Sequence, residues 1–352
     1  MTSARILFFS DTHLRDFGSF PPFNKVQENG FTRELNNILA GFDFVVDRIL
    51  EVLPAAVILP GDIFHSPEAL TTTTIAAAAR AFRSIKDACN DVGARFIIMP
   101  GNHDCYSEAL GIYSTSVLEG YGEMVTTDKV LKIQTGDKTW LRVGIVQFAT
   151  DEERTIVQLK TMAKKCDIIV THADFQGCAY ENGWRSESII PTNFPIPIIS
   201  GDIHCAQQIG SVYYIGSLVQ NRFTCRNLDQ VGGVLVYDSS DQSFERFPNT
   251  ASTHYLKIDE PEDLQVLINT PFNAALQIKC ELTPEEFTGL VGDREYVYIP
   301  MKKRAKAEVG SQPGMKLNFG SPFSMLKRFV AESRPEAVEF LASTLPEEAS
   351  DG

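Results

Sequence analysis

Short apolar runs alternate with longer amphipathic stretches over the first two thirds of the chain. The short runs are rich in β-branched residues and end at Gly, Pro or Asp, which is typical of buried strands. The predicted strands cover residues 5–10, 56–60, 95–100, 141–148, 167–171, 196–200 and 212–216. Apolar residues recur at helical spacing over residues 34–52, 71–91, 107–118 and 152–164. The alternation of strands and helices predicts an α/β fold built in layers.

The pattern changes after residue 248, where we expect the main catalytic domain (residues 1–248) to end. A small α+β domain is predicted over residues 249–300, with strands at 255–258, 274–280 and 295–299 and helices at 262–269 and 284–291. Residues 301–321 are rich in Lys, Gly, Ser and Pro, which indicates a linker. Residues 322–352 have helical spacing of apolar residues, interrupted near Pro335.

Most of the predicted strands end in a cluster of polar residues. Five strands are followed by Asp11-Thr12-His13, Gly61-Asp62, Gly101-Asn102-His103-Asp104, His172 and Gly201-Asp202-Ile203-His204. In open α/β sheets, sites form at the carboxyl ends of the strands. We therefore expect these clusters to converge at one edge of the structure.

The histidines of the chain are concentrated at these strand ends. Of six, five lie in or beside the clusters, namely His13, His65, His103, His172 and His204. Any one of them alone would be read as a surface or core histidine. Their joint occurrence with aspartates is typical of a metal site.

The spacing of these residues indicates how metal ions could be held. Asp11 and His13 are two apart, so on extended backbone both would point to one face, and Asp202-x-His204 repeats this spacing. Asp62 follows a glycine, where a turn could let its carboxylate bridge two ions. The predicted ligands are Asp11, His13, Asp62, Asn102, His172, Asp202 and His204. Mixed oxygen and imidazole ligation suits manganese, iron or zinc better than calcium.

Such a pair of ions would make a separate protein nucleophile unnecessary. Two divalent ions about 3.5–4 Å apart polarise a phosphoryl group and generate hydroxide near neutral pH. The chemistry expected is therefore hydrolysis of a phosphate ester by direct attack of metal-bound hydroxide on phosphorus.

The ordered motifs DxH, GD, GNHD, H and GxxH, from Asp11 to His204, resemble the calcineurin-like metallophosphoesterase superfamily. The resemblance implies an α/β fold in which a layered β-sandwich is flanked by helices. It implies one metal held by Asp11, His13, Asp62 and His204, and a second held by Asp62, Asn102, His172 and Asp202. It also implies that His103 is the general acid or transition-state stabiliser and that Asp104 orients it.

A finer resemblance concerns SbcD-like double-strand-break repair nucleases. The segment GDIFHSPEA (residues 61–69) is similar to their GDLFH-type motif, which implies that His65 assists catalysis at the phosphate. The segment YIGSLVQNRF (residues 214–223) and the domain at 249–300 resemble a strand and loop and a capping domain of that group. The resemblance implies a DNA exonuclease or endonuclease, manganese as the preferred ion with iron, zinc or magnesium as alternatives, and a homodimer. It further implies a role in DNA repair, recombination or replication and a tail segment that docks an SbcC-like ATPase, and the short chain suggests a phage-encoded version.

One departure from the family pattern leaves alternatives open. The family usually has GHxH where this chain has Asp202, which can still bind a metal ion but adds negative charge. One alternative function is a small-substrate phosphatase or nucleotide phosphodiesterase of the same fold. Another is a non-catalytic subunit that binds DNA ends, which Asp202 alone favours. The alternative for His65 is a histidine that caps a helix or only supports a metal ligand.

Composition adds limits on the setting of the protein. The net charge of −13 argues against a general nucleic-acid coating protein, so attraction of DNA would depend on the ions and on a local patch. Lys302, Lys303, Arg304 and Lys306 form a basic run that is either a solvated linker or a phosphate contact. Seven cysteines without a CxxC pair favour a reducing cytoplasm, that of the host if the protein is phage-encoded. We expect no membrane association, because no segment approaches about 20 apolar residues.

Overall fold

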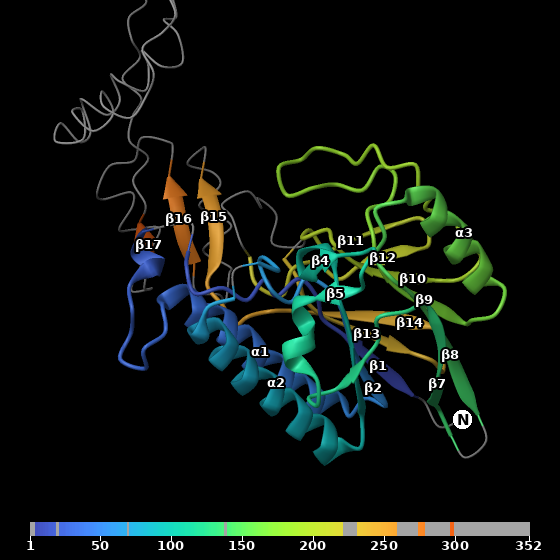
Figure 1. Ribbon diagram of the computed structural model, residues 1–352, viewed down its shortest axis with the longest axis horizontal. Helices are drawn as coiled ribbons and strands as arrows, with labels where there is room; N and C mark the ends of the chain where they lie inside the picture. The colour runs from blue at the N-terminus through green and yellow to red at the C-terminus, as the bar shows by residue number, and fades with distance from the viewer. Residues whose placement is uncertain are drawn as a thin grey trace, which may run out of the picture. The chain divides into compact units, whose positions relative to one another are not determined.

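The computed structural model describes residues 4–18, 21–68, 70–136, 139–220, 231–258, 274–278 and 296–298 (Figure 1). The chain divides into two compact units, Met1–Met301 and Lys302–Gly352, and every described residue belongs to the first. The predicted linker at 301–321, with its basic run, and the predicted tail helix at 322–352 lie outside the described residues. So do the two helices predicted at 262–269 and 284–291.

Two six-stranded mixed sheets form the centre of the protein. The first has the order β14-β13-β1-β2-β3-β6, in which β1, β2, β3 and β6 run parallel. Its strands are β1 (Arg5–Phe8), β2 (Ala56–Pro60), β3 (Arg95–Met99), β6 (Glu123–Met124), β13 (Gly233–Asp238) and β14 (Ser243–Pro248). The second has the order β11-β12-β10-β9-β8-β7, in which β8, β9, β10 and β12 run parallel. Its strands are β7 (Lys129–Gln134), β8 (Trp140–Val146), β9 (Ile168–His172), β10 (Ile198–Gly201), β11 (Gln207–Ile209) and β12 (Val212–Tyr214).

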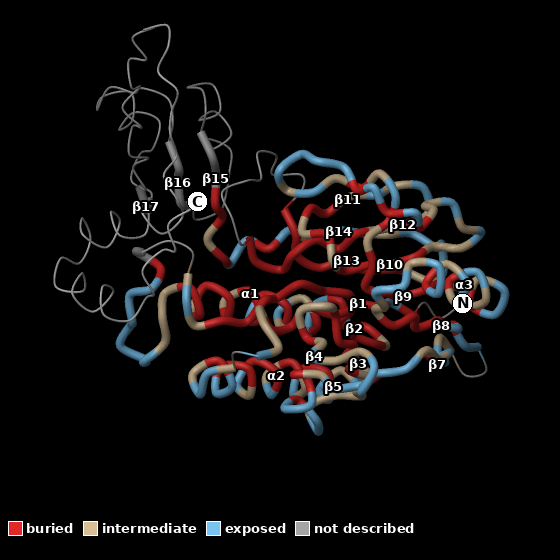
Figure 2. The backbone as a smooth tube through the Cα atoms, turned by 45° about the horizontal axis from the view of Figure 1, so that its top comes forward, coloured by how far each residue is buried: buried red, intermediate tan, exposed pale blue. Residues whose placement is uncertain are grey.

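The alternation of side chains along the strands builds a core with several layers. Ile6 and Phe8 of β1 point into a cluster shared with the second sheet, whereas Leu7 and Phe9 point into a cluster shared with α1 and α2. The helices that cover the sheets are α1 (Arg33–Val52), α2 (Thr72–Val92) and, on the second sheet, α3 (Glu152–Ala163). Figure 2 shows the buried residues running through the strands and along the inner sides of these helices. The predicted sandwich flanked by helices is confirmed.

The helix ends follow local capping chemistry. The side chains of Thr32 and Thr71 accept hydrogen bonds from backbone N–H groups in the first turns of α1 and α2, and Asp151 does the same for α3. α2 ends at Gly93, whose φ of +71° is the left-handed conformation that favours glycine. The helices predicted at 34–52, 71–91 and 152–164 are therefore confirmed to within a residue or so.

The helix predicted at 107–118 is wrong. The segment contains β4 (Cys105–Ser107), β5 (Ile112–Tyr113) and a 3-10 helix, η3 (Ser114–Leu118). Gly111 has a φ of +61°, which breaks a helix, and Leu110, Ile112 and Val117 are exposed, so the apolar residues share no buried face. Two further 3-10 turns are η1 (Pro21–Asn24) and η2 (Asn102–Asp104).

The edge strands β7 and β14 were not predicted because only part of each is buried. β7 alternates exposed and buried residues, and β14 forms an edge with no fully buried residue. Weak apolar patterns of this kind are typical of edge strands that face solvent on one side. They complete the two sheets but do not carry the polar clusters.

A third, parallel sheet contains β15 (His254–Ile258), β16 (Ala274–Ile278) and β17 (Tyr296–Tyr298). These strands agree with the three that were predicted for the small domain. The boundaries of that domain, residues 249–300, stay a prediction. In the part of the chain that is described, no helix is long and apolar enough to cross a membrane.

A buried ion pair links this sheet to the segment after β1. Glu34, at the start of α1, pairs with the guanidinium of Arg15 and accepts a hydrogen bond of 2.7 Å from the hydroxyl of Tyr255 in β15. All three side chains are almost fully buried. Arg15 also donates to the backbone carbonyl of His13 over 3.3 Å. Removal of either Arg15 or Glu34 would take away the ion-pair partner of a buried opposite charge, which lowers the free energy of unfolding.

We predict that Glu34→Ala lowers the free energy of unfolding by about 3–5 kcal/mol, because it removes the carboxylate that faces the buried guanidinium of Arg15. Urea denaturation followed by circular dichroism measures this. Glu51→Ala is the control, since Glu51 pairs with Arg48 while its side chain is 58% exposed, and it should cost less than about 1 kcal/mol. Equal losses in the two variants would contradict the prediction.

Candidate metal centre

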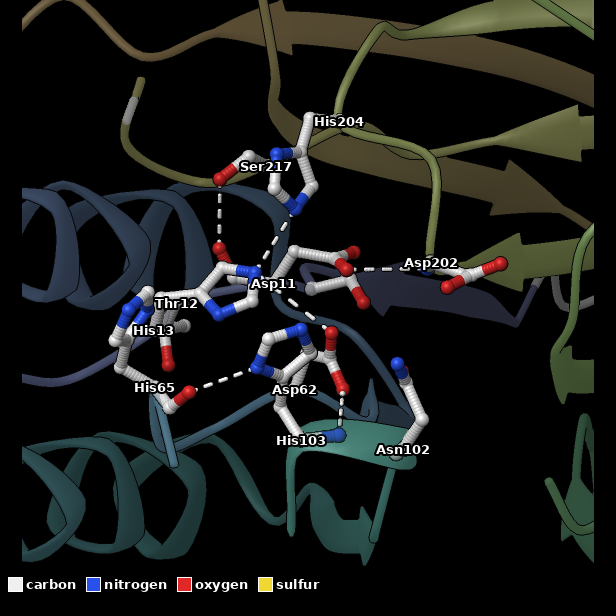
Figure 3. A network of polar contacts seen from close by, with 12 residues as sticks. Asp11, Thr12, His13, Asp62, His65, Asn102, His103, Asp202, His204 and Ser217 are labelled. Atoms are coloured by element: carbon white, nitrogen blue, oxygen red, sulfur yellow. Dashed lines mark hydrogen bonds and ion pairs between the residues drawn. The ribbon is translucent and has the colours of Figure 1, made fainter. Parts of the chain in front are cut away.

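The polar clusters predicted at the strand ends meet between the two sheets (Figure 3). Asp11 and His13 follow β1, and Asp62 follows β2. Asn102 lies in η2 directly after β3, His172 is the last residue of β9, and Asp202 and His204 follow β10. Four of these residues, Asp11, His13, Asp62 and His172, are buried almost completely. The structure therefore brings all seven predicted ligands together.

The loops after β1 and β2 hold each other through their backbones. The N–H of Asp11 donates to the carbonyl of Gly61 over 3.2 Å, and that of His13 donates to the carbonyl of Asp62 over 3.0 Å. The prediction of extended backbone across the DxH segment is wrong. Asp11 has a φ of +52° and His13 one of +43°, so both residues are left-handed. Asp202 is also left-handed, with a φ of +80°. Non-glycine residues in this conformation cost about 1–3 kcal/mol each and tend to cluster at functional sites.

Two glycines permit the loops to approach closely. A Cβ atom at Gly61 would lie 2.4 Å from Nδ1 of His172, and one at Gly101 would lie 2.3 Å from Oδ1 of Asp62. Both positions are surrounded by backbone or by buried side chains. A side chain at either position would therefore separate the residues of the site.

Asp62 lies between two groups of predicted ligands. Its Oδ2 is 3.7 Å from Nε2 of His13, which comes from the first sheet. Its Oδ1 is 3.1 Å from Nε2 of His172, which comes from the second sheet. His172 donates from Nδ1 to the carbonyl of Pro60 over 2.8 Å, so the Nε2 of the neutral ring can bind a cation. The two carboxylate oxygens thus face opposite sides, as a residue that bridges two ions requires.

In the described part of the chain, potential ligand atoms form three groups, one of which comprises His13, His65 and His103. Those of Asp11, His13 and His204 lie within 4.8 Å of one another, and so do those of Asp11, Asp62 and His172. Nε2 of His13 is 2.9 Å from Nε2 of His204. Two imidazole nitrogens point at the same place here, together with a carboxylate.

The donor set fits a divalent cation in two respects. Oδ2 of Asp11 is buried, and no described residue donates a hydrogen bond to it, which a cation would compensate. The terminal amide atom of Asn102 that faces the site is 2.9 Å from Nε2 of His172 and 3.0 Å from Oδ1 of Asp62. An amide oxygen among such acceptors suits a cation between them, whereas a rotated amide would donate to them. These residues could hold two ions.

Burial and neighbouring charges shift the pKa values of the side chains of the site. Burial lowers the pKa of His13, which keeps this ring neutral. Burial acts to raise the pKa of Asp62, but the charge and hydrogen bond of His172 hold that pKa well below its usual value. Burial acts to lower the pKa of His204, but Glu181, Asp11 and Asp62 together raise it to about 9. Ion binding must therefore displace protons as well as fill the site.

Asp202, which replaces the usual histidine, still faces the site. Its N–H donates to Oδ1 of Asp11 over 3.0 Å, and its Oδ1 is 3.7 Å from Nε2 of His172. Burial raises the pKa of this carboxyl to about 6. A carboxylate oxygen therefore faces the site where the resemblance implies a histidine nitrogen.

His103 and His65 lie on the opposite side of the site from His204 (Figure 3). The ring centroids of His13 and His103 are 4.9 Å apart, and those of His65 and His103 are 5.8 Å apart. His103 donates from Nδ1 to the backbone carbonyl of His65 over 2.7 Å. The two predicted catalytic histidines are thus brought together beside the metal ligands.

Asp104 does not orient His103 as predicted. Its carboxylate accepts hydrogen bonds from the backbone N–H groups of Ile63 (3.1 Å), Phe64 (2.9 Å) and Gly101 (2.9 Å). Burial raises the pKa of Asp104 to about 7. Asp104 joins the loops after β2 and β3, and the His65 carbonyl is what holds the His103 ring.

A hairpin of residues 176–190, between β9 and β10, contributes residues that the sequence did not indicate. A pocket of about 270 Å³ is lined by Asp62, His103, Tyr180, Glu181, Asn182, Asp202 and His204. Glu181 lies 3.5 Å from Nδ1 of His204, measured from its Oε2. Residues 180–182 belong to no motif and to no predicted element, so only the tertiary structure reveals that they reach the site.

Comparison with known proteins places the chain in a family. A model of the calcineurin-like phosphoesterases matches residues 4–206, which include all the predicted ligands. No curated protein sequence is significantly similar to the chain. Two solved structures are similar at low identity. GAP50, the anchor in the inner membrane complex of Plasmodium, is 11% identical over 81% of this chain and 99% of that one, with a TM-score of 0.38. A dimetal phosphatase from Danio rerio is 9% identical over 66% of this chain and 91% of that one, with a TM-score of 0.35.

The family assignment rests on the sequence match over residues 4–206, which covers more than half of the chain. Members of this family typically bind two divalent metal ions. The chain belongs to the calcineurin-like phosphoesterase family.

Proposed function

We propose that this phosphoesterase is a metal-dependent DNA nuclease that cleaves phosphodiester bonds as an exonuclease or endonuclease. Two divalent ions, preferably manganese, are held by Asp11, His13, Asp62, Asn102, His172, Asp202 and His204. His103 acts at the leaving oxygen and His65 at the phosphate. We further propose that it is an SbcD-like nuclease subunit, which is a more specific assignment than membership of the family.

The placement of His65 carries the proposal. Hydrolysis of a small phosphate monoester requires the metal ligands and one proton donor, but here a second imidazole lies beside His103. Phe17, which is 50% exposed, extends this side, with its ring centroid 5.5 Å from that of His65. An imidazole next to an exposed aromatic ring suits a substrate that continues past the scissile phosphate with further phosphates and bases.

A second observation supports a polymeric substrate. Within the segment 214–220, the hydroxyl of Ser217 donates to the carbonyl of Asp11 over 2.7 Å. Gln220 of the same segment exchanges two hydrogen bonds with the backbone of Tyr255, of 2.9 Å and 3.2 Å. The loop that holds a metal ligand is thus tied to the start of the third sheet. This connection suits a domain that positions DNA relative to the site.

The protein's own residues perform four tasks in the proposed reaction. When bound, the two ions would polarise the phosphoryl group and lower the pKa of the attacking water. Asp62 presents one oxygen to each side of the site, which fixes the separation of the two positions. His103, held at Nδ1 by the His65 carbonyl, keeps Nε2 available to donate a proton to the leaving oxygen. His65 contacts the phosphate, and Tyr180 and Asn182 limit the pocket on the other side.

The setting of the enzyme is proposed from the same resemblance. We propose a homodimer in the cytoplasm, that of the host if the chain is phage-encoded, with a role in DNA repair. An SbcC-like ATPase would dock on residues 322–352, which lie outside the described residues. Light scattering of the purified protein measures the dimer, and deletion of residues 322–352 followed by co-purification measures ATPase docking.

The test of the function is degradation of end-labelled double-stranded and single-stranded DNA in the presence of Mn²⁺. The native protein should degrade DNA, and the product ladder gives its polarity. If it cleaves a nucleotide monoester or a small diester but leaves DNA intact, a small-substrate phosphatase or phosphodiesterase replaces the proposal. If it binds DNA ends without cleaving any ester, it is a non-catalytic end-binding subunit.

We predict that Asp62→Asn abolishes tight binding of at least one Mn²⁺ and lowers turnover by at least about 100-fold. The reason is that residues which merely support a metal ligand already cost about 10–100-fold when removed. Isothermal titration with Mn²⁺ and the nuclease assay measure the two effects. Asp167→Asn is the matched control, since Asp167 pairs with Arg142 at the surface. Full turnover of Asp62→Asn would refute its bridging position.

We predict that His103→Ala leaves Mn²⁺ binding unchanged and lowers turnover by about 10²–10⁴-fold, the usual contribution of a general acid. The reason is that His103 is not one of the predicted ligands and that its Nδ1 is held by the carbonyl of His65. Metal titration and single-turnover cleavage of the same DNA give the two quantities. Unchanged cleavage would exclude the role of proton donor, and lost Mn²⁺ binding would make His103 a ligand.

A further inference from the structure

We propose that Glu181, which no motif marks, is a positioning residue that holds His204 in the orientation needed to bind a metal ion. Its carboxylate would accept the Nδ1–H of His204 and leave the Nε2 lone pair turned toward Asp11 and His13. This inference rests on the proposed metal site and not on the identity of the substrate.

The contact between the two residues gives the first argument. Oε2 of Glu181 is 3.5 Å from Nδ1 of His204, and its side chain is 13% exposed. Since a carboxylate only accepts, the proton of a neutral His204 ring belongs on Nδ1. Nε2 then carries the lone pair, and it lies 2.9 Å from Nε2 of His13. A carboxylate on the far nitrogen of a metal-binding histidine fixes both its tautomer and its ring orientation.

The hairpin that carries Glu181 is rigidly built, which gives the second argument. Tyr180 and Trp184 pair through a 2.8 Å hydrogen bond, and the N–H of Gly183 donates to the carbonyl of Tyr180 over 2.9 Å. Gly183 has a φ of +86°, which a tight turn at this point requires. Glu181 is therefore placed at the tip of a hydrogen-bonded turn.

The base of the hairpin is anchored to the strands that carry metal ligands. Asp174, two residues after His172, accepts hydrogen bonds from the hydroxyls of Tyr180 (2.5 Å) and Ser186 (2.7 Å). Gln207, three residues after His204, exchanges two hydrogen bonds with the backbone of Ala179, of 2.8 Å and 2.7 Å. One arm of the hairpin is thus clamped to the segment that bears His204, which sets the position of Glu181 relative to that ring.

The need for such a support follows from where His204 lies. His204 is in a loop between β10 and β11, and its side chain is 24% exposed, in contrast to the fully buried His13 and His172. Packing holds the ring of His172, and its Nδ1 donates a hydrogen bond to the Pro60 carbonyl. For His204, the contact with Glu181 takes the place of that carbonyl.

The test is titration of metal-free protein with Mn²⁺ in a calorimeter, for the wild type and for Glu181→Ala, Glu181→Gln and Glu187→Ala. Glu181→Ala should weaken one of the two Mn²⁺ sites by about 10–100-fold. Glu181→Gln keeps an oxygen that accepts the Nδ1–H, so it should recover most of the affinity. Glu187, exposed on the same hairpin, should have no effect when changed to alanine. If Glu181→Ala does not fold, Glu181→Met removes the acceptor while keeping the length, and it carries the same expectation.

Each outcome separates this inference from the proposed function. A wild type that binds no Mn²⁺ would defeat the metal site and the inference together. A wild type that binds two ions, with Glu181→Ala binding them equally well, would overturn the inference alone. Equal losses in Glu181→Gln and Glu181→Ala would also overturn it, because charge and not the orienting hydrogen bond would then matter. Equal melting temperatures of the metal-free variants show that the loss does not come from unfolding.

Discussion

The contact between Asp62 and His172 joins the two sheets at the point where the site forms. Asp62 follows β2 of the first sheet and His172 ends β9 of the second, with 3.1 Å between Oδ1 and Nε2. Both side chains are buried, so a change in the packing of the sheets would separate a charged pair away from water. The geometry of the metal centre therefore depends on how closely the sheets pack. The absence of side chains at Gly61 and Gly101 permits that distance.

The site concentrates negative charge in a place with little water. Asp11, Asp62 and Asp202 surround a small volume, and Asp104 lies behind them. Imidazoles and backbone N–H groups compensate part of this charge in the metal-free protein, as the low pKa of Asp62 reflects. Divalent ions would compensate it more completely, which couples ion binding to the stability of the loops. The left-handed backbone at Asp11, His13 and Asp62 is tolerated because the surrounding hydrogen bonds determine it.

Two structures reach the site from outside the central sheets. A series of buried contacts connects the third sheet to the site. Tyr255 donates to Glu34, Glu34 pairs with Arg15, and Arg15 donates to the carbonyl of His13. The hairpin between β9 and β10 reaches it through Glu181. In the proposed nuclease these two structures would have different tasks. The third sheet would connect the domain that positions DNA to the metal ligand His13. The hairpin would keep His204 turned toward the ion.

The sequence by itself determined the layered fold, the main helices and the set of residues that meet at the site. These follow from local patterns: β-branched runs, helical spacing of apolar residues, and polar clusters that come directly after strands. The sequence also indicated that Asp62 could bridge two ions, because its carboxylate follows a glycine at a turn.

Only the tertiary structure decided how those residues are held. The left-handed backbone of the DxH segment, the partners of Asp104 and the position of Glu181 beside His204 all depend on contacts with other parts of the chain. Glu34 meets Tyr255, and Asp104 meets the N–H groups of Ile63 and Phe64, across long separations in sequence. A local pattern shows which side chains are apolar or polar. The partner of a buried hydrogen bond, however, is the backbone group that tertiary packing places next to the side chain.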